Sequence, residues 1–489
     1  MRKSELIFLP TPAPGHLVST VEFSKRLISR NAGISVTILV INSPFSRGVS
    51  INKTDSTQDE ENASRIETGI RYVDLPQVDL PPPELFKESL ENTISVYIAS
   101  HRTHVRDAIT NLQNSSTVHV AGLVLDMFCT SMIDIANELG VASYLFFCSS
   151  AAFLGFLLHL KVHSEEAGIT QFEQSDDDAI IPCFQNPVPS RVLPAFAFNR
   201  VGYKAFMDLA ERYGETKGII VNTYAELEPH ALKSLADVYK TAPVYTVGPV
   251  LDLDSQVHKQ CDAEERDRIM GWLDKQMESS VVFLCFGSGG SFSEEQIREI
   301  SKGLIRSGQR FLWSLRKPPT GEVIKPSEYT EMELKSILDE EFMSLLEKEE
   351  AGLVCGWAPQ VEILSHKGIG AFVSHCGWNS TLESLWFGKP IVTWPLYAEQ
   401  QMNAFELARE LGIAVELRLD YMLHSNNLVL ASEVERAVKS VMEKDNPVRY
   451  KVKEMSDICR RALMEGGSSF RCVDQFITNF LGEIDLHAH

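Results

Sequence analysis

The chain has 489 residues, more than one hydrophobic core normally supports, so two domains are expected. A formal net charge of -20 and a pI near 5.2 argue against a nucleic-acid-binding protein, which needs a basic face, and against a site on anionic membranes. With 44% hydrophobic residues, the composition is sufficient for two globular cores.

The nine cysteines are scattered singly from Cys129 to Cys472, without a CxxC pair. This pattern is typical of reduced thiols in the cytosol and not of a disulfide framework or a zinc site. The start, MRKSELIFLPTPAPGH, contains only a short apolar run interrupted by prolines, so it does not predict a signal peptide. We therefore expect a cytoplasmic protein.

The first apolar run, residues 6–9, is followed by the turn Thr11-Pro-Ala-Pro-Gly15-His16 and by a helical pattern over residues 17–27. Strand, Gly/Pro turn and helix are the opening of a nucleotide-binding α/β domain, whose sites lie at the carboxyl ends of its strands. His16 occupies that position. A histidine beside glycine is more often an ordinary loop residue, so its place alone does not assign a role.

Further strands are predicted over residues 35–41 and 69–75, with a polar loop over 50–65 between them. A buried strand over 118–125 ends at Asp126, before a helix that runs to Leu139. An acid at a strand end ordinarily caps a helix or is solvated. Here, however, the strand is expected to end on the same sheet edge as His16.

Residues 141–160 carry no formal charge and are long enough to cross a membrane. The polar residues within them favour a strand over 142–147 followed by a helix, so no membrane span is predicted. Strands over 218–222 and 242–247 complete the first domain, and the polar run 252–268 after Gly248-Pro249 is the expected linker. Its Asp252 and Asp254 match an acid-x-acid metal motif, but we interpret them as solvated linker residues.

The second domain is predicted to open with a strand over 280–286 and the loop Gly287-Ser288-Gly289-Gly290-Ser291-Phe292. The loop lacks the last glycine of a dinucleotide fingerprint, which is replaced by Phe292, and Arg316 stands where an acid would end the next strand. These departures disfavour an NADP-dependent reductase. Residues 317–350 are predicted to be a charged surface insertion.

Residues 370–374 form a short apolar run, followed by the polar turn 375–378 and a helical pattern that opens at Asn379. A helix start exposes unpaired N–H groups and the positive end of the helix dipole, so it can hold a phosphate without Lys or Arg. The alternative is that Asn379 or Ser380 simply caps the helix. Helices are predicted over 433–443, 450–464 and 469–480, with Gly466-Gly467 before the last.

The 44 residues from Trp357 to Gln400, WAPQVEILSHKGIGAFVSHCGWNSTLESLWFGKPIVTWPLYAEQ, resemble the donor-binding signature of plant family 1 UDP-sugar-dependent glycosyltransferases. The resemblance covers essentially the whole chain. It implies an α/β fold of GT-B type, in which two doubly wound Rossmann-like domains face each other across a cleft. The implied parts are an acceptor-binding domain (1–248), a linker (249–268), a UDP-sugar-binding domain (269–465) and a C-terminal helix (466–489) that returns to the first domain.

The resemblance also implies a role for each matching residue. Trp357 would stack on uracil, Ala358 and Gln360 would meet the base and ribose, and Glu383 would accept hydrogen bonds from the ribose hydroxyls. The diphosphate would lie against the loop and turn, and the sugar would meet the residues that end the signature. The implied donor-binding set is Ser288, Trp357, Ala358, Gln360, His375, Gly377, Trp378, Asn379, Ser380, Glu383, Glu399 and Gln400.

By the same resemblance, His16 would be the catalytic base and Asp126 the carboxylate that orients it. Candidates for an acceptor pocket are Phe128, Phe146, Phe196, Phe198 and Ala398, with plain packing as the open alternative for the phenylalanines. No metal and no cofactor are expected, with UDP-glucose as co-substrate. Asn379-Ser380-Thr381 is an N-glycosylation sequon, and a glycan there would block the phosphate site, so a secretory route conflicts with this function.

The predicted function is inverting transfer of glucose from UDP-glucose to a hydroxyl of a hydrophobic plant metabolite, a flavonoid, phenolic or triterpenoid, by a monomer without membrane or nucleic-acid partners. Glucose is expected because glutamine at the position of Gln400 accompanies glucose use in the family. A UDP-sugar epimerase of the same fold and a non-catalytic UDP-sugar-binding protein remain open alternatives. The residues do not identify the acceptor.

Overall fold

The computed structural model describes residues 2–42, 65–67, 69–168, 170–175, 177–253, 262–319, 326–348, 351–423 and 427–487. Most of the polar loop predicted over 50–65, much of the predicted linker and Asp254 lie outside these residues. The chain forms two compact units. The first comprises Met1–Pro187, Phe196–Leu251 and Arg461–His489, and the second comprises Val188–Ala195 and Asp252–Arg460.

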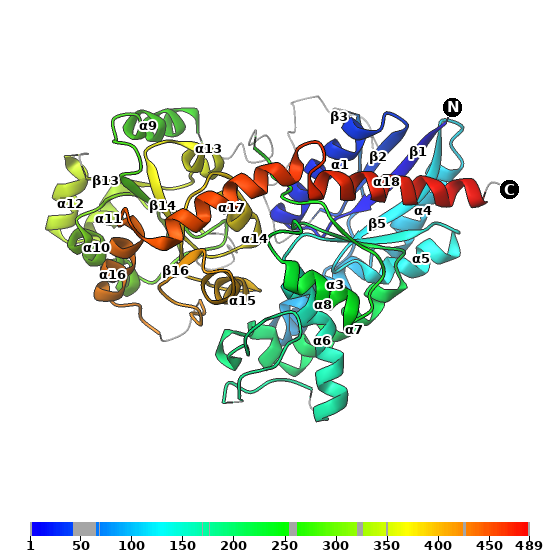
Figure 1. The fold of residues 1–489 in the computed structure, drawn as a ribbon, viewed down its shortest axis with the longest axis horizontal. Coiled ribbons are helices and arrows are strands. Elements are labelled where there is room, and N and C mark those ends of the chain that lie inside the picture. Colours follow the sequence, from blue (N-terminus) through cyan, green and yellow to red (C-terminus); the bar gives the residue numbers. More distant parts are fainter. Residues whose placement is uncertain are drawn as a thin grey trace. The chain divides into compact units, whose positions relative to one another are not determined.

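The first unit is built on an eight-stranded sheet in the order β3-β4-β2-β1-β5-β6-β7-β8, parallel except for the β3–β4 pair (Figure 1). Its strands are β1 (Lys3–Leu9), β2 (Ile34–Val40), β3 (Arg65–Glu67), β4 (Ile70–Asp74), β5 (Val118–Asp126), β6 (Ser143–Phe147), β7 (Ile219–Val221) and β8 (Val244–Thr246). Its helices are α1 (Pro14–Arg30), α2 (Pro83–Glu88), α3 (Leu90–Ala99), α4 (Arg102–Gln113), α5 (Ile133–Glu138), α6 (Ala151–Ala167), α7 (Arg200–Glu211), α8 (Pro229–Asp237) and α18 (Ser468–His487).

The second unit has a six-stranded parallel sheet in the order β13-β10-β9-β14-β15-β16. Its strands are β9 (Val281–Cys285), β10 (Arg310–Ser314), β13 (Gly352–Cys355), β14 (Ile369–Ser374), β15 (Ile391–Thr393) and β16 (Ala414–Glu416), beside a hairpin of β11 (Arg316–Lys317) and β12 (Ser327–Glu328). Its helices are α9 (Ala263–Leu273), α10 (Glu294–Ser307), α11 (Glu331–Ile337), α12 (Glu340–Glu347), α13 (Gln360–Ser365), α14 (Trp378–Trp386), α15 (Gln400–Phe405), α16 (Ala431–Met442) and most of α17 (Pro447–Leu463).

Each sheet reverses its strand order once, and that reversal positions the candidate site. In the first sheet β1 lies between β2 and β5, and in the second β9 lies between β10 and β14. The loops that leave the two strands at such a point diverge to opposite faces of the sheet, which leaves a crevice at their carboxyl ends. The sequence therefore places one ligand-binding edge in each unit.

The C-terminal helix α18 belongs to the first unit and lies along its sheet (Figure 1). Residues at the spacing i, i+3, i+4 and i+7 on one helix face, Val473, Phe476, Ile477 and Phe480, are buried in the core of that sheet. An ion pair of 2.6 Å between Arg30 on α1 and Asp474 adds a partly exposed contact. Burial of each large side chain stabilises this packing by about 1.5–3 kcal/mol.

Two predictions about local structure were wrong. Residues 317–350 are not only a surface insertion, because Phe342 on α12 is fully buried and stacks on Phe311 of β10 at 5.3 Å. Helix α1 begins at Pro14 and not at Leu17, since proline is favoured in the first helical turn. His16 consequently lies inside the first turn of α1. The pattern also missed β13 and β16, which have only four and three residues.

Residues 143–147 form strand β6 and residues 151–167 form helix α6, as the sequence predicted. Among the described residues, no helix is both long and apolar enough to cross a membrane.

Candidate active site

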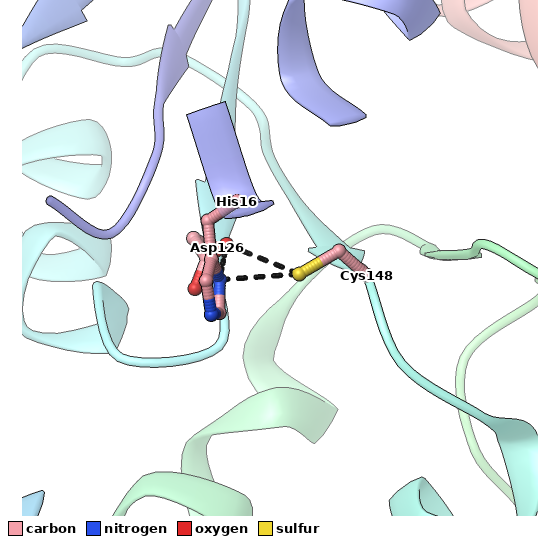
Figure 2. A group of neighbouring side chains, drawn as sticks. All are labelled: His16, Asp126 and Cys148. Carbon is pink, nitrogen blue, oxygen red and sulfur yellow. Dashed lines mark hydrogen bonds and ion pairs between the residues drawn. The ribbon is translucent and has the colours of Figure 1, made fainter. Parts of the chain in front are cut away.

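The first group of candidate residues lies at the strand reversal of the first sheet. His16 follows β1 in the first turn of α1, and Asp126 is the last residue of β5, the strand beside β1. The Nδ1 atom of His16 lies 2.8 Å from Oδ2 of Asp126 (Figure 2). Asp126 is 2% exposed, whereas the His16 side chain is 24% exposed. The carboxylate is therefore fixed, while the ring remains open to a ligand.

Two further side chains contact this pair, and neither was singled out from the sequence. The hydroxyl of Thr11 donates a hydrogen bond to Oδ1 of Asp126, so both carboxylate oxygens are held. The Sγ atom of Cys148, just after β6, lies 3.1 Å from Nδ1 of His16 and 3.8 Å from Oδ2 of Asp126 (Figure 2). Thr11 and Cys148 are brought to Asp126 by the order of the strands in the sheet, and the sequence did not reveal that order.

Opposing effects act on the pKa of His16. Burial of the ring tends to lower it, but the charge of Asp126, the neighbouring Cys148 and their hydrogen bonds outweigh burial and raise the pKa well above the ordinary value. The buried carboxylate thus stabilises the protonated imidazolium. A histidine held by a carboxylate at Nδ1 leaves Nε2 as the nitrogen that can accept a proton from a ligand.

The second group lies at the strand reversal of the second sheet, between β9 and β14. The loop 287–290 follows β9, and the turn 375–377 connects β14 to α14. His375 is 7% exposed, and a Cβ atom added to Gly287 or Gly377 would lie 2.7 or 2.5 Å from its Nε2. Both glycines are thus needed to admit the ring. Ser288 is exposed at the tip of the loop.

The buried His375 ring is neutral. Burial lowers its pKa to about 4, and its Nδ1 has no hydrogen-bond partner among the described residues. An uncharged imidazole at this edge can donate one hydrogen bond to an anion but adds no positive charge. A buried polar atom without a partner fits a residue that awaits a ligand.

Helix α14 begins without a side-chain cap. Its N-cap is Gly377, so Trp378, Asn379 and Ser380 occupy the first turn, and the alternative that Asn379 or Ser380 caps the helix is wrong. The preceding Cys376 has φ +62°, a left-handed conformation that is uncommon outside glycine. Its carbonyl accepts a hydrogen bond of 3.0 Å from the buried Asn403. The turn before α14 is therefore held in a strained shape, as at many ligand sites.

One turn into α14, Glu383 faces the start of α13. The amide of Gln360 donates to Oε2 of Glu383 at 2.6 Å and to the hydroxyl of Ser380 at 2.8 Å. Burial raises the pKa of Glu383 to about 7, although the bond from Gln360 opposes the shift and Asp252 adds to it. These three predicted site residues are therefore brought together in one hydrogen-bonded group.

Trp357 follows β13 and presents a half-buried ring beside the buried Ala358. The Arg316 guanidinium lies 5.0 Å from the ring centroid, and the Trp357 backbone N–H donates to Glu328 at 2.9 Å. A cavity of about 450 Å³ adjoins the ring; it is lined by Asp262, Glu265, Arg268, Leu315, Glu328, Tyr329, Leu334, Val354, Cys355, Gly356 and Trp357. One face of the indole is thus already taken by a cation.

The end of the signature folds into a tight turn before α15. Gln400 is 4% exposed, and its Oε1 accepts hydrogen bonds from the backbone N–H groups of Leu396 and Tyr397. The amide of Gln400 also bonds the Tyr397 hydroxyl, so the side chain is held by the turn itself, which narrows the role predicted for this residue. Ala398 is exposed with φ +57°, and Glu399 is half-buried.

The predicted acceptor-pocket residues do not form one group. Phe128 lies 6.5 Å from the His16 ring and 5.3 Å from Phe206, while Phe196 packs on Phe206 at 4.1 Å. Phe198 is half-buried at the end of a 3-10 turn. Phe146 is 1% exposed and stacks on Phe23 at 5.3 Å within the core, so the structure gives it a packing role.

Comparison with known proteins adds to this geometry. The family model described as "UDP-glucoronosyl and UDP-glucosyl transferase" matches residues 195–461. UDP-glycosyltransferase 71K1 of Malus domestica is 50% identical, with 99% of this chain and 100% of that protein covered. UDP-glucose flavonoid 3-O-glucosyltransferase 6 of Fragaria ananassa is 45% identical, with 97% and 98% covered.

Among solved structures, that of Medicago truncatula UGT71G1 complexed with UDP-glucose is 44% identical and superimposes with a TM-score of 0.86, covering 98% of each chain. Similarity at this level over both whole chains confirms the two-domain GT-B fold that was predicted from the sequence. The chain belongs to the UDP-glucosyl and UDP-glucuronosyl transferase family and has its GT-B fold.

Proposed function

We propose that this enzyme transfers glucose from UDP-glucose to a hydroxyl of a hydrophobic plant metabolite, with inversion at the anomeric carbon. The observation that carries the proposal is the hydrogen bond of 2.8 Å between the accessible His16 ring and the buried Asp126. A non-catalytic sugar-binding protein needs no base that is open on one side and held by a carboxylate on the other. An epimerase also uses a base, so the requirement for an acceptor separates the two enzymes.

The chemistry follows from that pair. As the acceptor oxygen attacks the anomeric carbon, its proton must leave, and Nε2 of His16 is the free nitrogen that can take it. The imidazolium that forms is stabilised by Asp126, whose own position is fixed by Thr11. Displacement of UDP in the same step inverts the anomeric centre.

The second unit is proposed to hold the donor. The N-terminus of α14 and the uncapped turn before it would bind the diphosphate, with a neutral His375 and Ser288 as hydrogen-bond donors. Gln360 and Glu383 would meet the ribose, and Trp357 the uracil. In this arrangement the departing UDP is stabilised by fixed dipoles, so the proposal includes no metal and no cofactor.

The acceptor is proposed to bind against the first unit. Phe128 stands nearest the base of the predicted aromatic residues, and Phe196 and Phe198 are further candidates. We do not extend the proposal to Phe146, because it is buried in the core. The relatives from Fragaria ananassa and Arabidopsis thaliana are named for 3-O-glucosylation of flavonoids and flavonols, which supports a flavonoid as the first acceptor to test.

We further propose that the enzyme acts as a cytoplasmic monomer, in which residues 1–248 bind the acceptor and residues 269–465 bind the donor. Residues 249–268 would link them, and 466–489 would support the first domain. The packing of α18 on the sheet of the first unit supports that last part.

The decisive experiment measures UDP release from UDP-glucose with a flavonol, a simple phenol, a triterpenoid alcohol or no acceptor. We expect release only with an acceptor, together with a glucoside product. Conversion of UDP-glucose to another UDP-sugar without acceptor would favour the epimerase. Tight UDP-glucose binding without turnover on any acceptor would favour the binding protein.

Thr11→Val is expected to slow transfer by about tenfold to 100-fold, since it removes a hydrogen bond to a charged carboxylate and leaves one oxygen of Asp126 unheld. Because Thr11 and the predicted donor residues belong to different units, the loss should fall on kcat and leave the donor KM unchanged. Thr11→Ser keeps the hydroxyl and should restore the rate. A rate for Thr11→Val equal to the wild type would refute this positioning role.

UDP-glucose binding is expected to strengthen as the pH rises toward 7. In the free protein the pKa of Glu383 is about 7, so its carboxyl is partly protonated at neutral pH. Ribose hydroxyls that donate to it favour the ionised form and lower its pKa, so binding releases a proton. The affinity should fall up to about tenfold per unit below pH 7 and level off above it.

Titration calorimetry with UDP-glucose measures this, and UDP itself is avoided because a terminal phosphate titrates near about pH 6. The matched variant Glu383→Gln cannot ionise and should flatten the profile. A slope that persists in Glu383→Gln would assign the proton to another group.

Gln400→His is expected to weaken glucose transfer relative to galactose transfer. Two backbone N–H groups fix Oε1 of Gln400 and so set the direction of its amide, and an imidazole cannot reproduce both contacts. Initial rates with UDP-glucose and UDP-galactose give the ratio. An unchanged ratio in Gln400→His would contradict the assignment of Gln400 to the sugar.

A further inference from the structure

We propose that His16, Asp126 and Cys148 form a binding site for Zn²⁺ or a similar thiophilic divalent cation, and that its occupation switches off the base. The three donor atoms, an imidazole nitrogen, a carboxylate oxygen and a sulfur, all lie within 4.8 Å of one another (Figure 2). They come from three separate segments: the first turn of α1, the end of β5 and the end of β6.

The distances suit zinc. The nitrogen–oxygen, nitrogen–sulfur and sulfur–oxygen separations are 2.8, 3.1 and 3.8 Å. Bond lengths of about 2.0–2.3 Å in a tetrahedron place ligand atoms roughly 3.3–3.6 Å apart. Small side-chain rotations therefore suffice to admit the ion. Asp126 and Cys148 are buried, whereas the His16 side chain is 24% exposed, so the ion would approach past the ring and take a water as its fourth ligand.

The donor set also selects the metal. A thiolate beside an imidazole favours Zn²⁺ or Co²⁺, whereas Mg²⁺ and Ca²⁺ prefer sites made of oxygen atoms. On binding, the thiol of Cys148 releases a proton to solvent. A neutral His16 keeps its single proton, which passes through solvent from Nδ1 to Nε2, whereas a protonated His16 releases the proton of Nδ1. The Asp126 carboxylate exchanges its hydrogen bond to His16 for a bond to the ion, and the charges of the ion, the thiolate and the carboxylate cancel.

A metal ion bound to His16, Asp126 and Cys148 would stop glucose transfer without preventing UDP from binding. A neutral imidazole that binds a metal through Nδ1 carries its remaining proton on Nε2. That nitrogen can then donate but cannot accept the proton of the acceptor hydroxyl. The donor residues lie in the other unit, so binding of UDP should be unaffected. The inhibition rests on the proposed role of His16, whereas the binding of the metal does not.

The test uses the full-length enzyme in a buffer free of chelating thiols. Titration with Co²⁺ should give a thiolate-to-cobalt charge-transfer band that saturates at one equivalent. Cys148→Ser and His16→Ala should each lose the band. Cys472→Ser is the matched control, because Cys472 is the one cysteine of the described residues that is not buried, and it should keep the band. No band, or a band that is unchanged in Cys148→Ser, would overturn the site.

The same variants test inhibition. Zn²⁺ should inhibit transfer and Mg²⁺ should not, and Cys148→Ser should need at least about tenfold more Zn²⁺ for half-inhibition, relative to its own metal-free rate. UDP affinity should stay the same with and without Zn²⁺. If Co²⁺ binds through Cys148 but the saturated enzyme keeps its full rate, the site stands and His16 is not the base. If Zn²⁺ inhibits Cys148→Ser as strongly as the wild type, the proposed switch is wrong.

Discussion

His16→Ala is expected to lower the rate of glucose transfer by about 100-fold to 10,000-fold, the range that a general base contributes. The reason is that the ring of His16, supported by the buried carboxylate of Asp126, is the proton acceptor that the described residues provide at this place. Binding of UDP should survive, because the predicted donor residues belong to the other unit. Single-turnover rates and UDP titrations separate the two effects.

Asp126→Ala should lose somewhat less than His16→Ala, and the double variant should be little worse than His16→Ala alone. The two residues act as one device, so their losses are not expected to multiply. Independent losses, or UDP affinity lost together with His16, would contradict the dyad.

The pH profile offers a second readout of the same pair. His16 must be neutral to accept a proton, so the rate should fall as the pH drops below its pKa. Burial lowers this pKa and Asp126 raises it, with the raised value prevailing. Without Asp126, the effect of burial is less opposed and the pKa of His16 falls. The acid limb of the pH–rate profile should therefore move to lower pH in Asp126→Ala. A limb that stays in place would mean that another group titrates.

Trp357→Ala is expected to raise the KM for UDP-glucose about fivefold to 150-fold, because stacking of a base on an aromatic ring contributes about 1–3 kcal/mol. The acceptor KM should change far less. Arg316 already covers one face of the indole at 5.0 Å, so the base is expected on the other face.

Trp386→Ala is the matched control for Trp357→Ala. It removes another tryptophan of the second unit that also lies under an arginine, Arg460, at 5.7 Å. It should leave the donor KM unchanged, since Trp386 is at the far end of α14. Equal increases in the donor and acceptor constants for Trp357→Ala would show that the residue is only structural.

Much of the fold was predictable because its strands are continuous apolar runs bounded by Gly, Pro or polar residues. The strands near residues 6–9, 118–125 and 369–374 have seven, nine and six residues and are mostly buried, so their pattern is clear. β16, with three residues, is too short to show a period. Phe342 sits in a highly charged stretch, and only its contact with Phe311 shows that α12 covers the sheet.

The candidate site likewise contains residues that could be predicted from the sequence and residues that could not. His16 and the residues of the signature follow strands directly, so their place at a sheet edge could be predicted and a family resemblance could assign roles. Thr11 and Cys148 could not be found, because their contacts with Asp126 join residues more than 20 positions apart and depend on strand order. The conformation of Cys376, with φ +62°, likewise carries no signal in the residue type.

The measurement that most directly tests the central proposal is the anomeric configuration of the glucoside formed from UDP-glucose, whose glucosyl bond is α. A single displacement by an acceptor hydroxyl that His16 deprotonates predicts a β-glucoside, seen in the proton NMR spectrum as a large coupling between the two axial hydrogens at C1 and C2. An α-glucoside, with its small coupling, would mean retention of configuration, by two displacements or by attack on the face that UDP leaves, and would contradict the single displacement in which His16 acts as the base.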